Sequence, residues 1–74
     1  MNLAITLVGP ESSTTITAES RTNFHQFLRW LKYYNPAEKY NLDYYPISTE
    51  NRLRTCRVKA SKLGLMVPDN RLVN

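Results

Sequence analysis

Few residues of this 74-residue sequence have the chemistry of a catalytic group. His25 is the only histidine, and it lacks the neighbouring nucleophile and acid that general acid–base catalysis would need. Cys56 is the only cysteine, so a zinc site built from these two residues would be two ligands short. Gly9 and Gly64 are too far apart to form a phosphate-binding loop. We therefore expect no enzyme activity, no bound metal and no cofactor.

The basic residues near the C-terminal end are the most informative feature of the sequence. Residues 50–74 hold six basic groups and two acids, whereas residues 1–49 hold four of each, so the net charge of +4 lies in the last third. Lys and Arg side chains that neutralise phosphates release counterions and thereby favour nucleic acid as a partner. A surface that serves only solubility usually mixes both signs. We expect a small DNA-binding regulator or accessory protein, with a solubilising surface or an acidic protein target as the alternatives.

The expected DNA contacts are of two kinds, set by their place on the last predicted helix. Polar groups near the start of that helix would reach base edges if the helix enters a major groove of duplex DNA. Cations further along would contact phosphate, which positions a protein without reading sequence. The expected contacts are Asn51, Arg52 and Thr55 for bases, and Arg54, Arg57, Lys59, Lys62 and, beyond the helix, Arg71 for phosphate.

All eight aromatic residues lie in one window, residues 24–45. Phe24, Phe27 and Tyr34 have helical spacing and are expected in the core. Aromatic rings at a surface are typical anchors for protein partners. The alternative function is therefore an inhibitor of the kind made by phages or mobile elements, which would bind a host protein with an acidic surface. The expected protein contacts are Trp30, Tyr33, Tyr44 and Tyr45.

The N-terminal residues are expected to form a β-hairpin. Leu3, Ile5 and Leu7 are spaced by two, as in a strand with one buried face. Turn residues follow at positions 9–12, and residues 13–17 are rich in the β-branched side chains that favour a second strand.

Two main helices are expected, at about residues 20–34 and 49–63. Ser20 has the chemistry of a helix N-cap, and aromatic and aliphatic residues then recur with the helical period. In the second helix Cys56 lies on a narrow apolar stripe and is expected to be buried. Asn35 also fits the N-cap of a further short helix that would begin at Pro36.

The C-terminal residues are expected to end the second helix and then turn back on themselves. Gly64 fits the residue after a helix end, and apolar triplets at 65–67 and 71–73 flank turn residues, which predicts a hairpin. Ala60-Ser61-Lys62-Leu63-Gly64-Leu65 resembles the Ala-x-x-x-Gly core of a helix-turn-helix. The winged-helix DNA-binding domains give the better resemblance, which implies that helix 49–63 is a recognition helix and hairpin 65–73 a wing.

The whole sequence, residues 1–74, is expected to form one α+β domain, because either half would be too small to bury a core. No apolar run approaches the roughly 18–20 residues of a membrane span, and the N-terminus lacks the pattern of a secretory signal. We expect a cytoplasmic protein that does not bind membranes. A homodimer would add the buried surface that so short a chain lacks.

Overall fold

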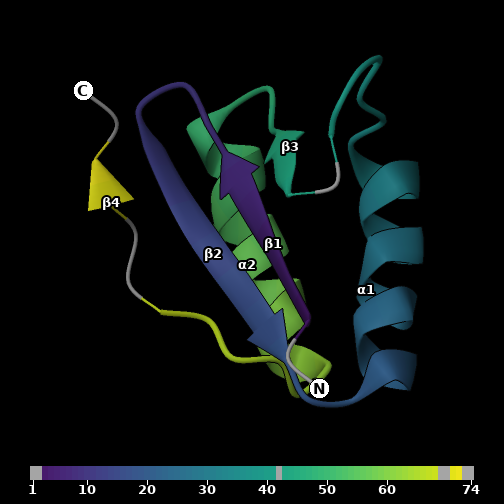
Figure 1. Cartoon of the computed structure of the whole chain (residues 1–74). Coiled ribbons are helices and arrows are strands. Elements are labelled where there is room, and N and C mark those ends of the chain that lie inside the picture. The colour runs from purple at the N-terminus through teal and green to yellow at the C-terminus, as the bar shows by residue number, and fades with distance from the viewer. Residues whose placement is uncertain (1–2, 42, 69–70, 73–74) are drawn as a thin grey trace.

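The protein folds into one sheet and two helices, shown in Figure 1. The computed structural model describes residues 3–41, 43–68 and the backbone of 71–72. In chain order the elements are β1 (Leu3–Val8), β2 (Ser12–Ala18), α1 (Arg21–Tyr34), β3 (Tyr44–Pro46), α2 (Glu50–Lys62) and β4 (Arg71–Leu72). The strand order is β3-β1-β2-β4; β1 is parallel to β3, and the other neighbours are antiparallel. The α+β class is confirmed.

Strands β1 and β2 form the N-terminal hairpin that the alternating pattern predicts. Their register pairs Val8 with Ser13, which leaves a short turn between them. Ile5 and Leu7 on β1 and Ile16 on β2 are buried, whereas the residues between them face away from the core. The period of two therefore gives the sheet one apolar face and one polar face.

Both helices cover the apolar face of the sheet. Figure 1 shows α2 crossing behind β1 and β2, with α1 to one side. The buried residues of both helices join the buried strand residues in a single core. Helices α1 and α2 contribute Phe24, Phe27, Leu31, Leu53, Cys56 and Ala60 to that core.

At both ends of α2 and at the start of α1, hydrogen bonds satisfy backbone N–H and carbonyl groups that have no partner within the helix. The hydroxyls of Ser20 and Thr49 accept hydrogen bonds from backbone N–H groups three residues later, at 3.2 Å and 3.1 Å. At the end of α2, Gly64 has a φ of +83°, and the Leu65 N–H donates to the Ala60 carbonyl oxygen at 3.0 Å. This is the Schellman arrangement. The helices expected at 20–34 and 49–63 are confirmed.

The residues after α1 do not form the expected short helix. Asn35 is instead the C-cap of α1 and is buried, and its side-chain amide donates to the Pro46 carbonyl oxygen at 3.1 Å. The Tyr45 hydroxyl donates to the Asn35 carbonyl oxygen at 2.7 Å and accepts from the Ala37 N–H at 3.3 Å. Burial raises the pKa of Tyr45, which keeps this hydroxyl a donor. These bonds fix the chain in an irregular path that joins α1 to β3.

The C-terminal hairpin of the expected wing is not shown. Met66 forms an antiparallel bridge with Thr17, and Arg71 pairs with Ser13, so both stretches bond to β2 instead of to each other. The Thr17 N–H donates to the Met66 carbonyl oxygen at 3.1 Å, and the Met66 N–H donates back at 2.9 Å. Residues 69, 70 and 73 of the expected hairpin lie outside the described residues. The sequence pattern predicts that the two strands of the wing pair with each other. Met66 and Arg71 pair with residues at the edge of β2.

Glu50, in the first turn of α2, ties that helix to the β1–β2 turn. Its carboxylate accepts hydrogen bonds from the Ser12 hydroxyl and from the backbone N–H groups of Glu11 and Ser12, the latter two at 2.9 Å and 3.1 Å. The turn approaches so closely that a Cβ at Gly9 would collide with the Glu50 carboxylate. Hydrogen bonding to Ser12 lowers the pKa of Glu50.

The lowered pKa of Glu50 predicts a pH-dependent contribution to stability. The ionised form is favoured in the folded state, so its contribution is present above the ordinary pKa of 4.5 and is lost as the pH falls through the folded value. Glu50→Gln should lower the thermal midpoint at pH 7, and the difference from wild type should shrink at pH 3. Thermal unfolding at both pH values measures this, with the exposed Glu38→Gln as control. A difference that stays constant with pH would contradict the assignment.

Cys56 is fully buried between α2 and the sheet, as the apolar stripe predicts. Burial raises the pKa of its thiol to about 11, so the group is a protonated thiol at neutral pH.

Cys56→Ala should therefore fold with a loss of about 1 kcal/mol in the free energy of unfolding, because only a small apolar contact is removed. Cys56→Asp should not fold, because it would bury an unpaired charge. Urea denaturation followed by circular dichroism tests both variants. Rapid alkylation of the native thiol, at the rate of an unfolded control, would argue against burial.

Candidate nucleic-acid interface

The two helices together, called the helical layer below, carry most of the positive charge of the protein. Eight of the ten basic residues lie on α1 and α2, and Glu50 is the only acid in either helix. The helices therefore sum to +7, and the rest of the chain sums to −3. Over residues 1–49 the charges sum to zero, which hides the contribution of α1, because the acids that balance its cations lie in other segments. The basic residues are Arg21, Arg29, Lys32, Arg52, Arg54, Arg57, Lys59 and Lys62.

The opposite side of the molecule carries no charge along its two long strands. β1 and β2 contain no charged residue, and their outward side chains are mostly hydroxyls. Thr6 and Thr15 face each other across the strands with their Oγ1 atoms 2.8 Å apart. The helices and this open sheet face thus divide the surface into a positive side and a neutral side.

Two of the α2 cations lie against α1 and contact aromatic rings. The Lys59 ammonium is 5.7 Å from the centre of the Trp30 ring, and the Arg52 guanidinium is 5.1 Å from that of Tyr34. Arg52 Nη1 also donates to the Tyr34 carbonyl oxygen at 2.8 Å. Trp30 and Tyr34 stack with their centres 4.8 Å apart. These cations serve both the contact between the helices and the positive surface.

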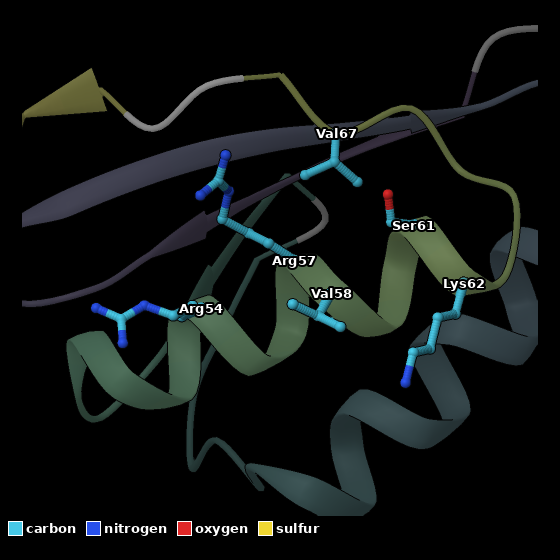
Figure 2. Close-up of a pocket in the computed structure, with 6 residues that line it drawn as sticks. All are labelled: Arg54, Arg57, Val58, Ser61, Lys62 and Val67. Atoms are coloured by element: carbon cyan, nitrogen blue, oxygen red, sulfur yellow. The ribbon is translucent and has the colours of Figure 1, made fainter.

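The opposite flank of α2 borders a hollow of about 470 Å³, shown in Figure 2. The Arg57 side chain is half-buried there, and its Nη2 atom donates to the Pro68 carbonyl oxygen at 3.0 Å. Arg54 and Lys62 are exposed at the two ends of the hollow. The lining residues are Arg54, Arg57, Val58, Ser61, Lys62 and Val67.

The basic residues expected to act together on α2 are thus divided between its two flanks. Asn51 and Thr55 are exposed on the helix, and the Thr55 hydroxyl donates to the Asn51 carbonyl oxygen at 3.2 Å. Arg71 belongs to β4 by its backbone, but its side chain lies outside the described residues. The cations of α2 therefore surround the exposed part of that helix.

The aromatic residues expected as protein contacts do not form one edge. Tyr45 is 0% exposed, which corrects its assignment as a contact. The alternation of β3 explains the correction, because Tyr44 and Tyr45 point to opposite faces of the strand. Tyr44 is 54% exposed on the neutral side, and Trp30 is half-buried between the helices. Only Tyr33, 91% exposed on α1, presents a nearly complete ring on the positive side.

Comparisons of the chain with protein-family models, with curated proteins and with solved structures give no match. Within the described ranges no helix is long and apolar enough to span a membrane. The same part of the chain contains no group of three or more histidine, cysteine or acidic side chains that could hold a metal ion.

Trp30 and Tyr33, which are near neighbours on α1, should respond differently to substitution. Trp30→Ala should lower the free energy of unfolding by about 2 kcal/mol, because it removes the stack with Tyr34 and the contact with Lys59. Tyr33→Ala should change it by less than about 0.5 kcal/mol, because the ring is exposed. Urea denaturation followed by circular dichroism compares the two. Equal losses would show that Tyr33 packs against the protein.

Proposed function

We propose that this domain is a non-enzymatic protein that binds duplex DNA through the helical layer, as a small regulator or accessory factor. The observation that carries the proposal is the gathering of eight cations with one carboxylate on one side of the molecule. That carboxylate, Glu50, is occupied by hydrogen bonds from the β1–β2 turn. With eight cations and one carboxylate the helical layer keeps a net charge of +7, which a polyanion such as DNA would neutralise.

The accessible cations are suited to contacts with phosphate. Arg29, Lys32, Arg54 and Lys62 are exposed, and Lys32 lies 5.6 Å from the centre of the Tyr40 ring. Hydrogen bonding to Tyr40 raises the pKa of Lys32, so this group stays charged at neutral pH. Lys and Arg on a surface of this kind neutralise phosphates in any sequence and release counterions.

The size of the molecule supports a single helix in the groove. The principal extents of the protein are 30, 25 and 20 Å, whereas a major groove is about 12 Å wide and admits one helix. We assign that helix as α2, with Asn51 and Thr55 toward base edges and α1 toward neighbouring phosphates. The resemblance to winged-helix domains agrees with this use of α2 and remains a prediction.

A protein partner is the second candidate, and the exposure of Tyr33 is the observation that favours it. A ring that is 91% exposed gains much apolar contact when a partner covers it. The cations around it would then face an acidic surface of the partner.

Salt titration of duplex binding tests the proposal with two matched substitutions. Lys62→Gln removes a positive charge from the helical layer, and Lys39→Gln removes one from the loop after α1. If Lys62 contacts a phosphate, its loss should reduce the slope of log K against log salt by about 0.9. Lys39→Gln should leave the slope unchanged. Fluorescence anisotropy with a labelled random duplex gives both slopes.

Two results would contradict DNA binding by the helical layer. One is the absence of duplex binding below about 100 μM at physiological salt, the weak end of non-specific affinity. The other is an equal loss of slope in both variants, which would place the contacts elsewhere. In the first case the protein partner becomes the better function, and a partner that binds Tyr33→Ala about 30-fold more weakly than wild type would support it.

A further inference from the structure

The hollow beside α2 combines cationic donors with an apolar floor (Figure 2). We propose that it binds one nucleoside monophosphate unit, with the phosphate at Arg54, Arg57 and Ser61 and the rings against Val58 and Val67. Such a unit occurs as a free nucleotide or at the end of a nucleic-acid strand. The inference deepens the proposed function, and it rests on that function only where the unit belongs to a nucleic acid.

Arg57 is the fixed element of this site. Its Nη2 atom donates to the Pro68 carbonyl oxygen at 3.0 Å, and its Nε atom is buried without a hydrogen-bond partner. The half-buried guanidinium is thereby held between α2 and the segment that follows it. Because its position is set before a ligand arrives, little side-chain entropy is lost when its remaining N–H groups bind an anion.

Helical spacing brings two further donors to the same flank. Arg54 precedes Arg57 by three residues and Ser61 follows it by four, so all three lie on neighbouring turns of one side of α2. Arg54 is exposed and free to turn toward a ligand. Lys62 extends away from Arg57 in Figure 2, so it adds to the local positive potential without belonging to the proposed donors.

The charge of the lining favours phosphate over a single carboxylate. None of the six lining residues is acidic, and Glu50, the acid nearest in the helix, is bonded to the β1–β2 turn. Two guanidinium groups and a hydroxyl offer more donors than one carboxylate can accept, whereas a phosphate monoester has three acceptor oxygens and a charge of about −1.5 to −2 at pH 7.

The apolar floor explains why the ligand would carry a ring system. Val58 is 49% exposed although it lies between charged neighbours, and Val67 is half-buried across the hollow. A flat ring placed over them would remove apolar surface from water, which an inorganic anion could not do. The hollow, at about 470 Å³, lies within the size range of small-molecule sites.

Amide NMR of the full-length ¹⁵N-labelled protein tests the proposal with three probes. Inorganic phosphate and adenosine 5′-monophosphate should each give saturable shifts confined to residues 54–61 and 67. The nucleotide should bind about tenfold more tightly than phosphate, because only it covers the valines. Adenosine, which lacks the phosphate, should give no saturable shift.

Variants with small effects on packing separate the two parts of the site. Arg54→Gln and Ser61→Ala should each weaken binding of both phosphate and nucleotide by about tenfold, since each removes a donor to the anion. Val58→Ser should weaken nucleotide binding alone, to the level of inorganic phosphate. Lys39→Gln, which removes an exposed cation from the loop after α1, outside the helical layer, is the control and should change neither affinity.

Three results would overturn the site: shifts spread equally over the cations of α1 and α2, no saturation by either phosphate compound, or equal binding of a tetra-aspartate peptide. The last would assign the hollow to an acidic protein segment. Nucleotide binding at the hollow without any duplex binding would refute the proposed function and leave this inference standing. Duplex binding that persists while phosphate and nucleotide cause no local shifts would refute the site at the hollow and leave the proposed function standing.

Discussion

The hydrogen bonds of the Glu50 carboxylate connect α2 to the β1–β2 turn, and both the path of the turn and the position of α2 depend on them. The carboxylate accepts hydrogen bonds from the β1–β2 turn, which requires glycine at position 9 because a side chain there would meet the carboxylate. The same bonds hold the carboxylate of the one acid of the helical layer at the turn and favour its ionised form. Fold and surface charge are therefore linked, because the one acid of the two helices is also the residue that positions α2 against the turn.

The parts of the fold that the sequence predicts are those set by neighbouring residues. Ser20 and Thr49 cap the helices, Gly64 ends α2, and alternating apolar residues form the hairpin, all within a few positions along the chain. Long-range contacts were not predictable in this way. The Tyr45 hydroxyl donates to the Asn35 carbonyl oxygen and accepts from the Ala37 N–H, and these bonds hold residues 35–37 in a path that is not helical. No local pattern shows that one of two adjacent tyrosines is buried.

The candidate site shows the same division between local and long-range information. The positive charge of α2 is evident from its sequence, but the addition of the α1 cations to the same surface emerges only when both helices are placed on one face of the sheet. The roles of individual cations also depend on tertiary contacts. Lys59 lies over Trp30, whereas Arg57 bonds to Pro68, so residues that look equivalent along the helix differ in freedom and in surroundings.

The open sheet face has a consequence for any assembly on a long polyanion. Its outward side chains on β1 and β2 are uncharged and rich in hydroxyls, and they lie on the side opposite the helices. A strand or duplex bound by copies of this protein through the helical layer would therefore present the uncharged side chains of β1 and β2 to the solvent.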